Sequence, residues 1–439
     1  MPTKFRWEIK LDIESLSRKI KVVILSVLLL FGCAGRGPLV VTDRPSPDVR
    51  LSPEIQLLDV PVRKISAAID QDGRVHVLAL ASKPPELHHL IIGIEGVLDR
   101  EVVTSSDSYG HLDIAFDSSG NLHAIVDEDH LVLENGTWRK LSKDPCVKLI
   151  RGGQDLFCLS RVEGKDVGAP GNWDWNLLVV GGYGAAACCL IPWHSHPDKF
   201  VLARKTPEGW SKLVLFDVET KFEIETPSIA ADKSGTLHVL YKAGEGGIVR
   251  DKQCDYVRIE PMTLGESSES NQSFSSDHEE APRTLTKVSG RAFITKGFRS
   301  RLDCDDIAAD SETGTALMTI REYQDYRHHT YSHIVEDGKI GPQVPMYDFD
   351  GVIDVESAGE GRFLALGIRL DQGFWTATWY IYYLEYHDGM WSAPVELGKE
   401  IYRGALKLRN VVLLSDLDRR AFALWTNKDG RPVARWIER

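Results

Sequence analysis

One recurring unit constrains the fold of this chain more than any other feature: alternating apolar residues, an Asp, two residues, a Gly, two residues and a His. It is clearest over 68–78, where Asp70, Gly73 and His76 hold the three marked positions. Period-two alternation interrupted by an Asp and a Gly predicts two antiparallel strands joined by a tight turn. Clear and degraded copies are anchored at positions 70, 117, 151, 232, 310, 356 and 416.

The spacing of these anchors predicts the architecture. Neighbouring anchors lie as close as 117 and 151 and as far apart as 151 and 232. The short gaps suit a four-stranded blade, and the long gaps indicate insertions at 163–199 and 263–290. A second signature, such as Asn135-Gly136 followed by Trp138, predicts the outer hairpin of each blade. We therefore expect an all-β protein with a single β-propeller domain over 55–439, of about seven four-stranded blades, with six as the alternative.

The N-terminus predicts export. The first 32 residues hold six Lys/Arg against three Asp/Glu, and 22–31 is apolar except for Ser26. Ten residues are too few to cross a bilayer, which needs about 20. A basic region followed by a short apolar run is the layout of a signal peptide, here 1–32. Residues 33–54, rich in Gly, Pro, Ser and Asp, are predicted to form a flexible tether.

The end of the apolar run, Leu30-Phe31-Gly32-Cys33-Ala34-Gly35, resembles the lipobox of bacterial lipoproteins. In that family the signal is cut before the Cys, which then receives acyl chains such as palmitate. The resemblance implies lipidation at Cys33 and a membrane-anchored protein of the cell envelope, on the outer membrane or a periplasmic face. Phe31 departs from the usual pattern, and an uncleaved signal anchor or simple secretion are the alternatives.

Charge and missing motifs exclude several functions. The formal net charge is −12, and it becomes −15 when the first 32 residues are left out, which argues against nucleic acid as a partner. The chain has no Gly-rich phosphate loop, no Gly-x-Ser-x-Gly and no Cys-x-x-Cys. No cofactor is therefore expected.

Six cysteines follow Cys33, and an even number in an exported chain permits disulfides. Connectivity does not follow from sequence, but two pairs are plausible: Cys146–Cys158 and Cys254–Cys304. The adjacent Cys188 and Cys189 could form a vicinal disulfide or stay reduced in a core.

The repeated histidines and aspartates are interpreted as structural. His76, His123 and His238 hold the same place in different units, so they lie around a ring and do not converge. Phe157 and Phe422 hold that place elsewhere, as expected of a packing position between blades. The aspartates of the units are predicted to cap their turns by accepting backbone N–H bonds.

Two regions supply candidate ligand-binding residues. The insertion over 168–198 places aromatic rings on a Gly-rich segment, where they could stack on sugars or pack on the rim: Trp173, Trp175, Tyr183 and Trp193. Its His194, His196 and Asp198 are weak metal candidates without a completed ligand set, so no metal site is predicted. The loops opposite the Asp-Gly turns offer groups that could grip a carboxylate or form a solvated rim: Arg301, Arg321, Tyr323, Arg327, Arg369 and Trp375.

The repeat set resembles the sialidase-like and BNR-type propellers over about 58–436. The Asp-box of that group, Ser-x-Asp-x-Gly-x-Thr-Trp, is absent, and its nearest echo is 134–138; the Phe-Arg-Ile-Pro start motif is also absent. The resemblance therefore implies the fold and does not carry over the chemistry. We predict a lipid-anchored binding or scaffold module for a glycan or an envelope protein, and we lean against an enzyme. The alternative is a sialidase-like glycosidase or lyase acting on an anionic sugar.

Overall fold

The computed structural model describes most of the repeat region. The described residues are 47–105, 111–143, 146–152, 155–162, 175–180, 187–192, 199–206, 209–217, 227–244, 252–260, 288–295, 301–324, 327–347, 349–372, 376–403, 411–416 and 420–439. They contain strands and no helix, and none of them belongs to a helix long and apolar enough to cross a membrane. The predicted signal peptide over 1–32, Cys33 and most of the tether lie outside these residues.

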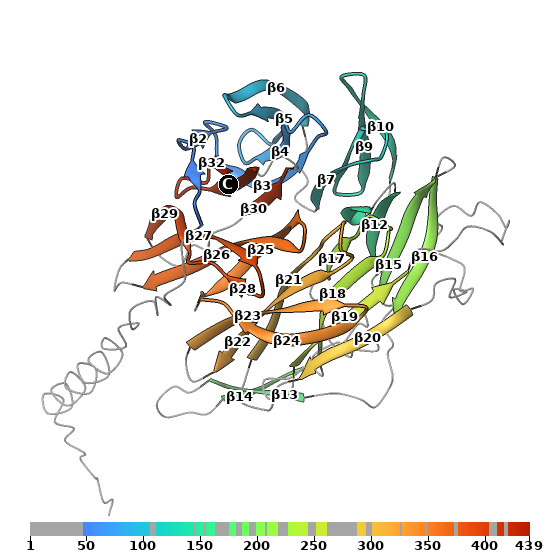
Figure 1. The fold of residues 1–439 in the computed structure, drawn as a ribbon. Coiled ribbons are helices and arrows are strands. Elements are labelled where there is room, and N and C mark those ends of the chain that lie inside the picture. Colours follow the sequence, from blue (N-terminus) through green and yellow to red (C-terminus); the bar gives the residue numbers. More distant parts are fainter. Residues whose placement is uncertain are drawn as a thin grey trace, which may run out of the picture.

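The strands form seven antiparallel blades arranged in a ring, so the predicted propeller and its count of seven are confirmed (Figure 1). Blades one to three comprise β3 (Val62–Ile69), β4 (Val75–Ala81), β5 (Glu86–Gly93) and β6 (Gly96–Ser105); β7 (Leu112–Phe116), β8 (Leu122–Val126), β9 (Asp129–Glu134) and β10 (Thr137–Lys143); and β11 (Cys146–Gly152), β12 (Asp155–Val162), β15 (Lys199–Thr206) and β16 (Gly209–Asp217).

The other four blades have the same plan. They comprise β17 (Ser228–Ala231), β18 (Leu237–Gly244), β19 (Lys252–Ile259) and β20 (Val288–Thr295); β21 (Arg301–Ala309), β22 (Ala316–Gln324), β23 (Arg327–Glu336) and β24 (Lys339–Pro345); β25 (Gly351–Gly359), β26 (Arg362–Gln372), β27 (Thr376–His387), β28 (Met390–Trp391) and β29 (Val395–Arg403); and β30 (Val412–Ser415), β31 (Arg420–Thr426) and β32 (Pro432–Glu438) with β1 (Arg50–Leu51) and β2 (Ile55–Gln56).

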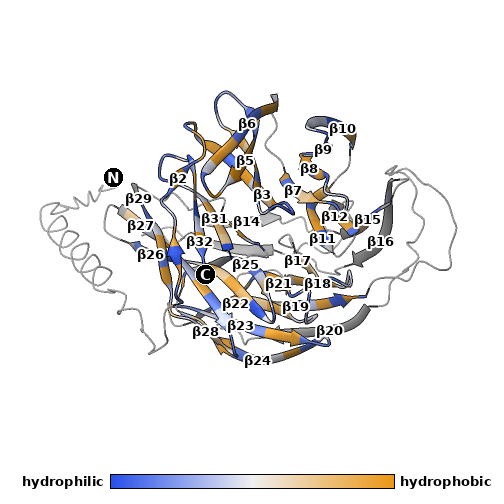
Figure 2. Ribbon diagram, turned by 45° about the horizontal axis from the view of Figure 1, so that its top comes forward, coloured by the Kyte–Doolittle hydropathy of each residue, from blue (hydrophilic) through white to orange (hydrophobic). Residues whose placement is uncertain are grey.

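The first strands of the blades contact one another in order around the axis, and β30 of the last blade contacts β3 of the first. We call these seven strands the inner ring; they are β3, β7, β11, β17, β21, β25 and β30. Seven apolar clusters form the core among the described residues, and each joins two neighbouring blades. Figure 2 shows the apolar residues distributed along the strands of every blade. The core therefore follows the ring and depends on every blade having both neighbours.

Each repeat unit marks the turn between the first and second strands of a blade, and the predicted turn chemistry is confirmed. Asp70 Oδ1 accepts hydrogen bonds from the N–H groups of Asp72 (2.9 Å) and Arg74 (2.8 Å). Gly73 has a φ of 75°, which costs glycine little. The expected outer hairpins are also present, as where Thr137 pairs with Glu134.

The unit in blade six is the exception, because Glu356 does not occupy the turn. It lies within β25, opposite Leu364, and the turn follows at Glu360 and Gly361. The ladder between β25 and β26 shifts register between Ser357 and Gly359, so counting residues from a neighbouring unit misplaces the turn.

The N-terminal strands close the ring. Ile55 pairs with Ala434 and Leu51 pairs with Ile437, so chain segments from both ends share blade seven. Closure of this kind satisfies edge groups that would otherwise remain unpaired.

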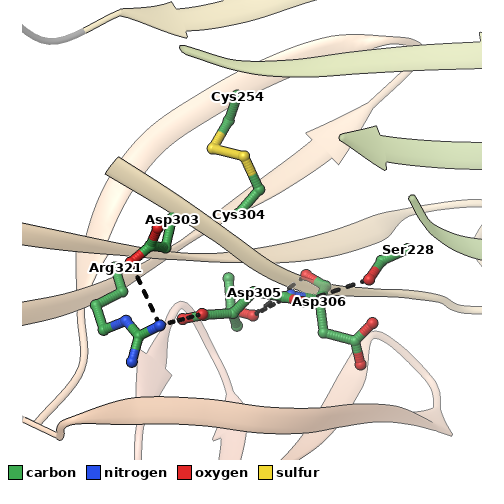
Figure 3. The surroundings of a disulfide bond; sticks show 8 residues. Ser228, Cys254, Asp303, Cys304, Asp305, Asp306 and Arg321 are labelled. Carbon is green, nitrogen blue, oxygen red and sulfur yellow. Dashed lines mark hydrogen bonds and ion pairs between the residues drawn. A yellow bond between two sulfur atoms is a disulfide. The ribbon is translucent and has the colours of Figure 1, made fainter. Parts of the chain in front are cut away.

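Both plausible disulfides are present. Cys146–Cys158 joins β11 to β12, and Cys254–Cys304 joins blade four to blade five (Figure 3). The predicted insertions lie largely outside the described residues. Within the first of them, β13 (Trp175–Val180) and β14 (Ala187–Pro192) pair as a separate two-stranded sheet that includes the backbone of Cys188 and Cys189.

Candidate functional site at the propeller axis

Carboxylates of the inner ring satisfy backbone donors of the adjacent blade. The axial edge of each first strand has N–H groups without a strand partner, and burying such groups unpaired is costly. The N–H of Leu149 in blade three donates to Asp113 Oδ2 in blade two (2.7 Å), and Ser66 of blade one donates its hydroxyl to Asp113 Oδ1 (2.8 Å). Asp113 therefore connects three consecutive blades.

The same arrangement recurs in blades five to seven. The N–H of Val355 donates to Asp306 Oδ2 (3.0 Å), and the N–H of Leu413 donates to Asp354 Oδ2 (2.7 Å). Here the aspartates lie beside Glu356, two residues beyond Asp354 on β25. We call Asp306, Asp354 and Glu356 the axial acid cluster.

The electrostatics of the cluster are unusual for carboxyl groups. Burial, followed by the nearby charges of Asp306 and Glu356, raises the pKa of Asp354 well above its ordinary value, although the N–H bond from Leu413 opposes the shift. The side chain of Asp306 raises the pKa of Asp354 further.

Glu356 is the member with the clearest chemical potential. Burial and the charge of Asp306 raise its pKa to about 8, with Lys148 of blade three acting in the opposite direction. Within the described part of the chain, no hydrogen bond joins the Glu356 carboxyl to another protein group, and the side chain is half-buried. At neutral pH this carboxyl is protonated, so it can both donate and accept hydrogen bonds.

Arg321 lies toward the end of blade five that is opposite the Asp-Gly turn. Its guanidinium is already paired with other groups of the protein. Its guanidinium lies 3.4 Å from Asp303 and 3.3 Å from Asp305 (Figure 3). It also donates a hydrogen bond to the carbonyl of Asp350. Gly351 allows this approach, because a Cβ there would lie 2.8 Å from Arg321 Nη1. Arg321 thus joins blade five to the start of blade six.

Arg369 of blade six has a different acidic neighbour. Its Nε lies 3.5 Å from Asp371, and the rings of Tyr380 and Tyr382 stack nearby on β27 with centroids 6.2 Å apart. Tyr323 packs against His328 in blade five. The structure therefore places the arginines on adjacent blades, each beside its own acids.

The remaining candidates cannot be placed at side-chain level. Arg301, Arg327 and Trp175 lie in described strands, but only their backbone is described. The others lie outside the described residues: Trp173, Tyr183, Trp193, Trp375, His194, His196 and Asp198. No group of three His, Cys, Asp or Glu among the described residues is arranged to hold a metal ion.

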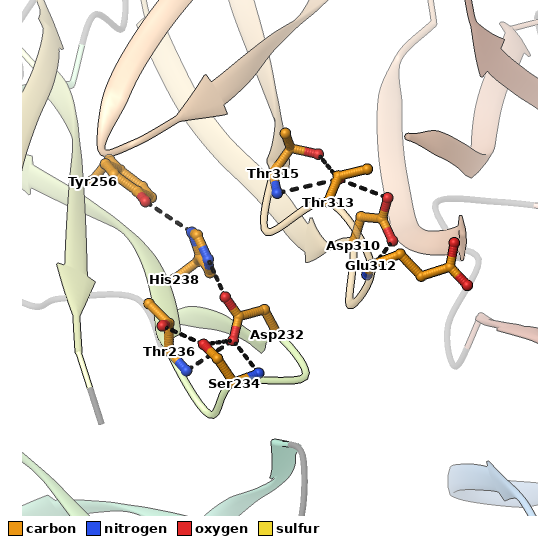
Figure 4. Close-up of polar contacts among 9 residues, drawn as sticks. All are labelled: Asp232, Ser234, Thr236, His238, Tyr256, Asp310, Glu312, Thr313 and Thr315. Atoms are coloured by element: carbon orange, nitrogen blue, oxygen red, sulfur yellow. Dashed lines mark hydrogen bonds and ion pairs between the residues drawn. The ribbon is translucent and has the colours of Figure 1, made fainter. Parts of the chain in front are cut away.

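The repeated histidines are structural, as predicted. In blade four, His238 Nδ1 pairs with the Tyr256 hydroxyl (2.8 Å), and its Nε2 lies 4.0 Å from Asp232, which caps the turn (Figure 4). In blade two, His123 links Asp117 Oδ2 (3.2 Å) to His130 Nε2 (2.9 Å). These contacts run from the turn toward the outer strands, away from the axis.

The turn face also has a groove of about 330 Å³ between blades one and two. Asp70, His76 and Phe116 contribute to its lining. His76 continues through His89 Nε2 (3.0 Å) to Glu101 (2.8 Å from His89 Nδ1), so its polar wall is already engaged in the packing of blade one.

The environment of His123 predicts that the folded protein loses stability at acidic pH. Burial lowers the pKa of His123, against the opposing effect of Asp117. A group whose pKa is lower in the folded state stabilises the protein above its unfolded value of about 6.5 and loses that contribution as the pH falls below it. We expect His123→Phe to be less stable at pH 7.5 by about 1–3 kcal/mol, because the His130 ring nitrogen loses its partner. The variant should also lose less stability than wild type between pH 7.5 and 5.5 in urea unfolding; equal losses would contradict the assignment.

Sequence reasoning did not identify Asp113, Asp354 and Glu356 as candidate site residues. The available signal was an acidic residue within an otherwise apolar first strand, as in 112–116 and 351–359. An acid at such a position is unusual unless it is paired or functional.

Comparisons with known proteins show only distant likeness. No protein-family model matches the chain, and no curated protein matches it. Among solved structures, it is similar to Kuenenia stuttgartiensis hydrazine synthase (10% identity, TM-score 0.46, 86% of this chain and 96% of that one). It is also similar to an α-L-arabinofuranosidase from Fusarium graminearum (10%, 0.38, 88% and 97%) and to the α-L-arabinanase of Penicillium chrysogenum (10%, 0.38, 88% and 98%). At these TM-scores the similarities carry no argument about the activity of this chain.

Proposed function

We propose that this protein is a lipid-anchored β-propeller of the cell envelope that binds a glycan at the axis of its ring. The observation that carries the binding site is Glu356, a protonated carboxyl beside Asp306 without a hydrogen-bond partner in the described protein. Sugar hydroxyls donate and accept hydrogen bonds at once, and a carboxyl next to a carboxylate offers both functions. The anchor rests on the sequence around Cys33.

The charges at the axis favour a neutral glycan over an anionic sugar. The axial acid cluster consists of carboxyl groups, so the negative charge of an anionic sugar would be repelled there. Arg321 is not available to bind an anion, because its guanidinium is already paired with Asp303, Asp305 and a carbonyl group.

A glycosidase is the second candidate, and the same residue favours it. Glycoside hydrolysis uses one carboxyl group held protonated at neutral pH as the acid and a second, ionised carboxyl as base or nucleophile. Glu356 has the pKa expected of the acid. Asp306, whose charge raises the pKa of Glu356, would supply the second group.

Glu356→Leu tests binding and Glu356→Gln tests acid catalysis. Glu360→Gln is the control, since Glu360 is an exposed turn residue four positions away. On arrays of neutral and anionic oligosaccharides we expect wild type and Glu360→Gln to bind a neutral class. Glu356→Leu should bind about tenfold or more weakly, the effect of losing one good hydrogen bond, whereas Glu356→Gln keeps a donor and an acceptor and should bind nearly as well as wild type. Equal binding by Glu356→Leu and wild type would remove Glu356 from the site. Release of new reducing ends by wild type and not by Glu356→Gln would identify a glycosidase.

A further inference from the structure

The outer hairpin of blade one, residues 93–105, exposes an unusual number of apolar side chains. Ile94, Val97, Leu98 and Val102 are 43%, 40%, 56% and 55% exposed. They are four of the six large hydrophobic side chains that are exposed in the described part of the chain. Single exposed apolar residues are ordinary, but a group of this kind within nine residues indicates a contact surface.

The backbone of the hairpin argues against a partner that adds a strand. The ladder between β5 and β6 shifts register twice, between Leu87 and His88 and between Ile91 and Ile92. Such bulges twist an edge strand away from pairing, which is how natural sheets discourage strand addition. Leu98 falls at one of the bulges, and its side chain is 56% exposed. The hairpin is therefore suited to a partner into which its side chains insert, and not to one that pairs with its backbone.

The hairpin lies beside the point where the N-terminal segment enters the ring. The Trp436 indole N–H donates to the carbonyl of Gly93 (3.0 Å), and the N–H of Ser52 donates to the carbonyl of Trp436 (3.0 Å). Figure 1 shows β5 and β6 next to β2 and β32. Trp436 therefore links the hairpin, through two hydrogen bonds, to the segment that leads back to Cys33.

The length of that segment keeps the hairpin near the anchor. Sixteen residues lie between Cys33 and Arg50. Fully extended they span at most about 60 Å, and as a flexible coil about 20–25 Å. A surface tethered this close reaches a high effective concentration, so even weak contacts are occupied.

We propose that this hairpin docks into the lipid surface to which Cys33 is anchored, inserting Leu98 and Val102 and holding blade one toward the membrane. The proposal rests on the proposed lipid anchor. Glu95, Asp99 and Glu101 lie on the same hairpin with Arg100 as the one cation, so a zwitterionic lipid surface fits it better than an anionic one.

Hydrogen exchange on the acylated full chain tests this, with and without phosphatidylcholine vesicles. Amides of 94–103 should exchange more slowly when vesicles are present, and Leu98→Asp with Val102→Asp should abolish that protection. Ile401→Asp is the matched control: Ile401 is 52% exposed on the outer strand of blade six, and its replacement should leave the hairpin protected.

The outcomes separate the docking surface from the anchor. Flotation of the protein with vesicles without protection of 94–103 would overturn the docking and leave the anchor intact. Failure of the protein to float would refute the anchor. Hydrogen exchange would then be repeated with an excess of vesicles. Slower exchange of 94–103 would support docking, and unchanged exchange would overturn it. Protection that follows protein concentration in place of lipid concentration would assign the surface to a second copy and overturn the proposal.

Discussion

Deletion of residues 432–439 should abolish cooperative folding. The deleted segment contains β32, which pairs with β31 on one side and with β1 and β2 on the other. It also removes Trp436 and Ile437, which are 1% and 0% exposed. Truncating one large buried side chain costs about 3–5 kcal/mol, and whole domains have only about 5–15 kcal/mol of stability. Thermal unfolding followed by circular dichroism should therefore show no native transition, or one at a far lower temperature.

A pair of point variants keeps this prediction interpretable if the deletion is insoluble. Trp436→Ala should melt well below wild type, because its ring packs on Phe422 and bonds the Gly93 carbonyl across to blade one. Met390→Ala is the control, since Met390 is 52% exposed. If Trp436→Ala melted within a degree or so of wild type, the closing blade would not contribute to stability as the structure indicates.

The fold could be predicted because the residues that form its turns are close together in the sequence and can be recognised there. In blades one, two and four, the turn from the first strand to the second has an Asp that accepts two backbone N–H bonds and a Gly at positive φ, so sequence displays them directly. Blade three lacks the Asp, yet Phe157 still placed its strands, because the residue after the turn must pack between blades. Glu356 was misplaced because a bulge changes the spacing, and spacing was the only guide.

The axial site could not be predicted in the same way. Asp306 and Glu356 are 50 positions apart, and Lys148 lies in blade three. They influence one another only because the ring brings the first strands of distant units to one axis. Sequence shows which residues are acidic; the closure of seven blades decides that three of them share one small region.

Glu356→Gln should make the folded protein more stable at alkaline pH, which is the opposite of what most substitutions at a half-buried position do. Glu356 has a pKa of about 8 in the folded state, well above the value of 4.5 expected when it is exposed. The folded state therefore holds a proton that the unfolded state releases between these two values. Its contribution is fully present below about pH 4.5 and is lost as the pH rises to about 8. Glutamine does not titrate and has nearly the same shape.

The gain from the substitution should therefore grow with pH. We expect the two proteins to unfold at similar urea concentrations near pH 5, and Glu356→Gln to be more stable by an amount on the order of 3 kcal/mol near pH 8. Glu360→Gln should follow wild type at both pH values, because Glu360 is exposed and its pairing with Arg362 is a surface interaction. A constant difference between Glu356→Gln and wild type across this range would mean that Glu356 titrates normally. The axis would then lose the protonated carboxyl on which the glycan site depends, so this measurement judges the proposed chemistry before any ligand is known.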